Sequence, residues 1–170
     1  AQWVQALSAN AGGNYNTAQG YQSLLSNTGN YNTAQWYMTL KNNTSGRNNV
    51  AVGASALYSN INGGYNVAVG ESTLWSNTNG GYSTAIGPFA LYSNINGGYN
   101  VANGYFSLYG NTTGNYNTAI GNNSLYNNTT GVNNTANGNN SLGQNKTGSY
   151  NSAYGDSALS NSITNSNNTA

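Results

Sequence analysis

Charge, histidine and cysteine are scarce or missing in this chain, and their scarcity limits the functions open to it. The 170 residues contain three Lys or Arg, two Asp or Glu, no His and no Cys. The usual general bases, thiol nucleophiles and metal clusters are therefore missing. The two carboxylates, Glu71 and Asp156, hold the same position in repeats that lie five coils apart. That separation is about 24 Å at the strand spacing, too far for a glycosidase pair. We expect that the protein is not an enzyme and that it binds neither a cofactor nor a metal ion.

The low charge also narrows the class of partner. A net charge of +1 provides no basic surface for phosphates, so we do not expect nucleic acid as a partner. Apolar runs are only a few residues long, which predicts no insertion into a membrane. Solubility must come from Asn, Ser, Thr, Gly and Tyr, and an uncharged polar surface of this kind suits an exposed fibre. We expect the protein to be extracellular or at a cell surface.

What the chain does have is a strict repeat of about 17 residues, in which alanine and leucine keep fixed positions. The alanines are Ala1, Ala18, Ala34, Ala51, Ala68, Ala85, Ala102, Ala119, Ala136, Ala153 and Ala170. A leucine follows six residues after each of the first ten, and only the step from Ala18 to Ala34 is shortened, to 16 residues. A disordered low-complexity tract would not keep these positions. A period this short predicts a solenoid, because each unit must stack on its neighbours to bury its apolar face. We expect one array of ten coils over residues 1–170, as a segment or subunit of a longer fibre.

Two columns of glycine divide each predicted coil into two short segments. One column includes Gly63 and Gly80, and the other lies two residues after the alanine, as at Gly70. A glycine fixed at one position indicates either a positive φ or a close approach of two backbones. The segments between the glycines, such as 66–70 and 55–58, are typical of strands. The sequence therefore predicts an all-β parallel β-solenoid with two strands in each 17-residue coil.

Leucine and asparagine are the predicted interior of the rod. Leu57, Leu74 and Leu91 represent the one large apolar side chain that every coil supplies. Asparagines hold two further fixed positions, and the first of them is represented by Asn60, Asn77 and Asn94. Stacked in register, their amides can hydrogen-bond from coil to coil, as in cross-β asparagine ladders. We interpret both sets as structural.

Aromatic residues form the candidate surface. In five successive repeats the residue after the leucine is aromatic, and these residues are Tyr58, Trp75, Tyr92, Tyr109 and Tyr126. Alternation predicts that they face away from the leucine, toward solvent or a partner chain. They either stack to stabilise the rod or form a wall for sugar rings or for a second copy. Trp3 and Trp36 replace glycine in two repeats and are candidates for an interaction or assembly site. A second aromatic column, which includes Tyr65, flanks the glycine corner, and there stacking is the favoured interpretation.

The segments 66–70, 83–87 and 117–121, with sequences such as Asn-Thr-Ala-Ile-Gly, resemble the head repeats of YadA-like trimeric autotransporter adhesins. Similar arrays followed by Ala-Leu-Tyr-Ser-Asn occur in phage tail fibres. The resemblance spans all ten repeats. It implies a left-handed β-roll, often trimeric, that is exposed on a bacterium or phage and serves attachment.

Three functional hypotheses follow. The first is a structural extracellular filament or fibre shaft, with adhesion as an additional role. Its partners would be copies of itself, joined end to end or laterally, for example as a trimer, and carbohydrate or a host surface. The second is a receptor-binding segment of a phage tail fibre or trimeric adhesin. The third is ice binding by the β-branched row that precedes the alanine, which includes Thr84, Val101 and Thr118.

Overall fold

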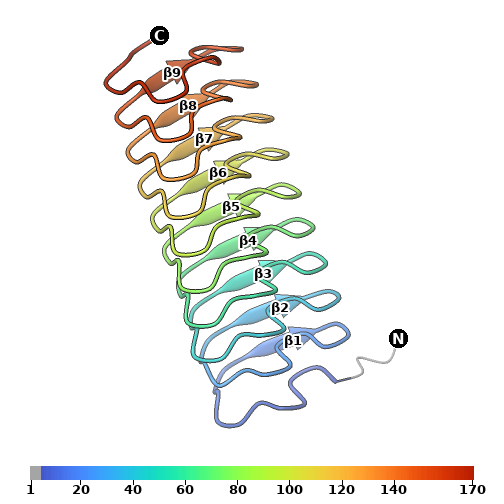
Figure 1. Cartoon of the computed structure of the whole chain (residues 1–170). Coiled ribbons are helices and arrows are strands. Elements are labelled where there is room, and N and C mark those ends of the chain that lie inside the picture. The colour runs from blue at the N-terminus through green and yellow to red at the C-terminus, as the bar shows by residue number, and fades with distance from the viewer. Residues whose placement is uncertain (1–4) are drawn as a thin grey trace.

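The fold is a single parallel β-solenoid, seen in a computed structural model that describes residues 5–170. Each coil contributes one three-residue strand, and each strand pairs in parallel with the next, in the order β1 to β9 (Figure 1). The strands are β1 (Thr17–Gln19), β2 (Thr33–Gln35), β3 (Val50–Val52), β4 (Val67–Val69), β5 (Thr84–Ile86), β6 (Val101–Asn103), β7 (Thr118–Ile120), β8 (Thr135–Asn137) and β9 (Ser152–Tyr154). Residues 5–170 contain no helix. The predicted all-β parallel solenoid is confirmed.

The number of coils differs slightly from the prediction of ten. Nine strands define eight complete turns. The first expected strand falls at Ala1, outside the described residues, and the last is reduced to one bridge between Ser152 and Thr169. Alanine pairs with alanine in every register, including Ala18 with Ala34 across the short repeat. That repeat has one residue fewer in its loop, where Thr28 alone separates Asn27 from Gly29, so the strand register is unchanged.

Each strand turns its alanine inward and its two neighbours outward. In β5, Ala85 is fully buried, Ile86 is exposed and Thr84 is partly exposed. Behind the alanines lies a column of leucines, fully buried from Leu24 to Leu142. The core is therefore one alanine and one leucine thick in every coil, as the repeat predicts.

The predicted second strand is wrong. Residues 55–58 form turns, and both Ser55 and Leu57 have left-handed backbones, with φ of 58° and 52°. A non-glycine residue in this region costs roughly 1–2 kcal/mol and persists only where its surroundings fix it. Here the N–H of Leu57 still donates to the Thr73 carbonyl of the next coil at 2.9 Å. The chain must close its turn within 17 residues, and the curled segment achieves this while keeping the leucine inside.

Both proposed reasons for fixed glycine occur, one in each column. Gly70 and its equivalents have positive φ, 135° at Gly70 itself, which L residues rarely adopt. Gly63 and its equivalents lie against the next coil, where a Cβ atom would collide with the Gly80 carbonyl and with buried asparagine side chains.

Candidate functional site

The interior asparagines form continuous ladders along the rod. Asn77 Nδ2 donates to Asn60 Oδ1 in the preceding coil at 2.8 Å and to the Gly80 carbonyl of its own turn at 2.9 Å. Asn94 bonds in the same way to Asn77 and Gly97, and all of these asparagines are fully buried. The ladder has no accessible face, so it joins coils and offers nothing to a ligand.

A second buried ladder joins most coils to the next by two hydrogen bonds, and Ser83 replaces its asparagine in one coil. The Oδ1 atom of Asn66 accepts the backbone N–H of Ser83 at 3.1 Å, and its Nδ2 donates to the Gly80 carbonyl at 2.9 Å. The same pair of contacts recurs at Asn49 and Asn117. Backbone groups of the turn are thereby satisfied inside a thin core.

The central aromatic column is a half-buried stack. Centroid distances from Tyr58 through Trp75, Tyr92 and Tyr109 to Tyr126 lie between 5.2 and 5.5 Å, with planes at most 12° apart. The Nζ atom of Lys41 lies 5.6 Å from the Tyr58 ring centroid and continues the column at one end. Phe89 and Phe106 pack against the same stack. Since the inner rings have a neighbour on both faces, only their edges are free for a partner.

Of the two tryptophan candidates, Trp3 lies outside the described residues, and Trp36 lies on the surface. Trp36 takes the position that glycine holds in most other coils, with φ of 100°. Its side chain is 61% exposed and stacks on no other aromatic ring among residues 5–170. A large residue in a glycine conformation, exposed to solvent, is strained without contributing to the core.

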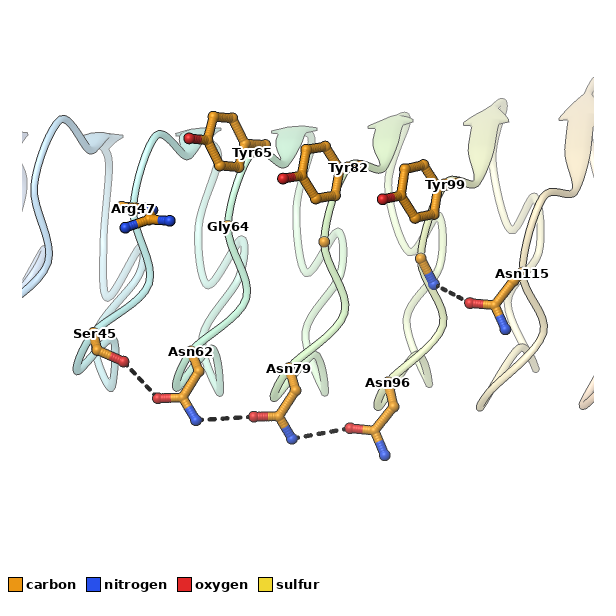
Figure 2. A pocket seen from close by; sticks show the side chains of 12 residues that line it. Ser45, Arg47, Asn62, Gly64, Tyr65, Asn79, Tyr82, Asn96, Tyr99 and Asn115 are labelled. Carbon is orange, nitrogen blue, oxygen red and sulfur yellow. Dashed lines mark hydrogen bonds between the residues drawn. The ribbon is translucent and has the colours of Figure 1, made fainter.

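A groove lies at the glycine corner, and the sequence prediction missed it. Its floor is a column of three glycines, Gly64, Gly81 and Gly98. The same column carries a side chain in the flanking coils, Arg47 at one end and Asn115 at the other (Figure 2). The groove exists because three successive repeats have Gly-Gly-Tyr at this corner. That doubling of glycine is the signal in the sequence that could have located it.

One wall of the groove is a row of tyrosines. Tyr65, Tyr82 and Tyr99 stack at 4.9 Å with planes no more than 4° apart. All three have left-handed backbones, with φ between 57° and 60°. Their hydroxyl groups point the same way along the row, toward the Arg47 end (Figure 2). Within residues 5–170 these hydroxyls make no hydrogen bond to other protein groups.

The other wall is an exposed amide ladder. Ser45 Oγ donates to Asn62 Oδ1 at 2.6 Å. Asn62 Nδ2 donates to Asn79 Oδ1 and Asn79 Nδ2 to Asn96 Oδ1, both at 3.0 Å. Asn115 closes the far end, where its Oδ1 accepts the Gly98 N–H at 2.7 Å. The groove thus pairs a row of hydroxyls with a row of amides, both repeating once per coil.

Charge in and around the groove is limited to one residue. Arg47 is exposed, and no carboxylate lines the groove. Glu71 and Asp156 are exposed in other columns, and Asp156 accepts a hydrogen bond from Asn139 at 2.9 Å. Residues 5–170 bring no three metal-ligating side chains together. The groove can therefore offer hydrogen bonds and one guanidinium to a ligand.

Comparison with known proteins adds no relative to these observations. No family model matches the chain, and neither the curated proteins nor the solved structures contain a match. No helix in the described part of the chain is long and apolar enough to cross a membrane. The interpretation of function therefore depends on the geometry and on the pattern of the sequence.

Proposed function

We propose that this protein is a structural rod of an extracellular fibre or filament, built to provide length and stiffness. The observation that carries the proposal is the continuity of its coil-to-coil bonding. Strand pairing runs unbroken from β1 to β9, and one asparagine ladder runs from Asn10 to Asn145. A second asparagine ladder, in which Ser83 replaces one member, and aromatic stacks over part of the rod add further contacts between coils. An array of this kind has nearest-neighbour contacts only, so its stability adds up along the axis.

The surface composition supports an exposed setting for this rod. Only five of the 170 residues are charged, so the surface is hydrated mainly through amide and hydroxyl groups. Such a surface has few charge–charge interactions for salt to screen, so changes in ionic strength affect it little. The resemblance to YadA-like repeats adds a left-handed winding and trimeric assembly to the proposal. Under this proposal, the partners of the chain are further copies of itself.

Cryo-electron microscopy of the purified chain tests this proposal. We expect rods that join into filaments with a repeat near 4.8 Å along the axis, the spacing of stacked strands. Monodisperse single rods at high protein concentration would contradict self-assembly. The number of chains across each rod would decide for or against the trimer.

A receptor-binding segment of a tail fibre or adhesin is the second candidate, and the corner groove favours it. A smooth shaft has no need of three successive glycines beneath unpaired tyrosine hydroxyls. Binding of the chain to cells or to immobilised glycans would support this role. Binding to neither would favour the role of a fibre shaft without receptor binding.

Ice binding is the third candidate, and the outward face of the sheet favours it. The row that includes Thr84 and Thr118 lies outward beside a second row that includes Ile86 and Ile120, one residue of each per coil. Asn103, Asn137 and Tyr154 interrupt the second row, and Gln19 and Gln35 occupy its first two positions. A thermal hysteresis assay tests it, and freezing that is unaltered at high protein concentration would dismiss it.

A further inference from the structure

We infer that the groove over Gly64, Gly81 and Gly98 binds a carboxylated polysaccharide, with the chain laid along the rod and a carboxylate held by Arg47. This inference goes beyond the structural role and does not depend on filament formation.

The shape of the groove fits a chain rather than a single sugar. Its volume is about 580 Å³, within the range of ligand pockets. From the coil of Arg47 to that of Asn115 there are four coil steps, or about 20 Å at the strand spacing. The floor has no side chains over three coils, so a ligand can lie directly on the backbone. Polar groups recur along both walls at the coil repeat, which matches a polymer of similar residue length.

The unused hydrogen-bonding capacity of the walls fits a polyhydroxylated ligand. In the exposed ladder, the Asn62 amide uses one acceptor site in the contact with Ser45 and one N–H in the contact with Asn79. An amide has two N–H donors and two acceptor sites, so part of each remains for a ligand. The hydroxyls of Tyr65 and Tyr82 can both donate and accept. Sugar hydroxyls can do the same, so the two surfaces are complementary.

Stacking on a sugar ring plays a smaller part here. Tyr82 has Tyr65 on one face and Tyr99 on the other, each at 4.9 Å. Recognition must then use ring edges and hydroxyls. A protein partner fits less well. Protein interfaces are anchored by large side chains that enter apolar pockets, and the glycine floor has no such pocket.

Arg47 gives the site its preference for an acidic ligand. The guanidinium group is planar and presents paired N–H donors that match the two oxygens of a carboxylate. It forms no ion pair within residues 5–170, because no carboxylate lies near it. A neutral glycan could accept single hydrogen bonds from this group but would lack the paired, charge-assisted contact of a carboxylate.

The test uses the full chain and isothermal titration calorimetry with oligosaccharides of galacturonate, alginate and hyaluronan. The methyl esters of the same oligosaccharides serve as neutral controls with identical chains. We expect at least one acidic oligosaccharide to bind, and its ester to bind several-fold more weakly. Absence of heat with all three at millimolar concentration would overturn the inference. Equal affinity for acid and ester would overturn the role of Arg47.

Variants locate the site. Arg47→Gln should remove the preference for acid over ester, whereas Lys146→Gln, which makes the same charge change outside the groove, should leave it intact. Gly81→Asn copies the residue at Asn115 into the groove floor and should abolish binding. Tyr82→Phe removes a hydroxyl while keeping the stack and should weaken binding several-fold. Circular dichroism melting checks that each variant folds, and unchanged binding by folded Gly81→Asn would place the ligand elsewhere. Filament formation by the variants reports on the structural role separately.

Discussion

Replacing Ser162 by asparagine should add one rung to the buried ladder that now ends at Asn145. Ser162 occupies the ladder position in the last coil, but its hydroxyl makes no hydrogen bond. Asn145 Oδ1, which would accept from the next rung, is also buried and has no partner. In every inner coil the equivalent oxygen accepts from the following asparagine, as Asn128 Oδ1 does from Asn145 at 2.8 Å.

The size of the effect follows from the contacts of an inner rung. Each rung donates once to the preceding asparagine and once to a carbonyl three residues ahead, which for position 162 is that of Asn165. Asn165 O already accepts from Asn151 Nδ2 at 2.8 Å, but Gly80 O accepts from both Asn77 and Asn66 in the same way. A hydrogen bond contributes about 0.5–1.5 kcal/mol net, and satisfying a buried acceptor recovers about 1–3 kcal/mol. After the cost of fixing the new side chain, we expect a gain of about 1–3 kcal/mol.

The gain should be local, because a solenoid opens from its ends. Hydrogen exchange is therefore the assay, read at backbone amides of the last coils such as Lys146 and Ser152, which donate to Ile163 and Asn168. We expect slower exchange there in Ser162→Asn, and no change at Asn77 in the middle of the rod. Ser162→Ala is the control and should leave these rates nearly unchanged. If Ser162→Asn exchanges like the wild type, the ladder does not stabilise the rod as we have reasoned.

Four further outcomes follow from the same structure. Asn77→Ser should cost about 2–4 kcal/mol, since it leaves a donor and an acceptor unpaired in the neighbouring rungs, measured by chemical denaturation. Leu91→Ala should cost about 2–5 kcal/mol by the same assay, because the leucine is the only large core side chain of its coil. Trp36→Gly should stabilise by about 1 kcal/mol, as it restores the residue that suits a positive φ, and a loss of thermal stability would contradict this. Tyr82→Asn should lower the melting temperature by removing two stacking contacts of about 0.5–1.5 kcal/mol each, partly offset because Asn tolerates the left-handed backbone, as at Asn48.

The parts of this fold that the sequence predicts are those set by periodicity. The burial of Ala85 and Leu91 and the stacking of Asn77 on Asn60 each follow from residues that recur at one interval, since equal spacing places them on one line along the rod. Periodicity carries no information on the sign of φ. The segment from Ser55 to Tyr58 runs through the leucine between two turns and is predicted as a strand, yet left-handed residues at Ser55 and Leu57 curl it into a turn.

The corner groove escaped prediction for a different reason. Gly63 and Gly64 are adjacent, and the fixed column at Gly63 accounts for one corner on its own. Because Gly64, Gly81 and Gly98 recur in three coils only, they form no column along the whole repeat array. The role of Gly64 appears only when the neighbours at its position, Arg47 and Asn115, are seen to carry side chains where Gly64 carries none. A groove that is formed by missing side chains is recognised only when its residues are compared with those at the same position in the coils before and after it.

The bonding between coils also has a direction, which constrains any fibre built from this chain. In the first ladder each Nδ2 from Asn27 onward donates to the asparagine of the N-terminal neighbour, and in the second each asparagine Oδ1 from Asn16 to Asn151 accepts a backbone N–H of the C-terminal neighbour. A further coil can continue this pattern only if it has the same polarity. Growth along the axis must then be head to tail, a heterologous contact that does not close on itself and so forms open filaments. Filaments seen by electron microscopy should accordingly be polar, and a two-fold axis perpendicular to the rod would show that copies join by their sides instead.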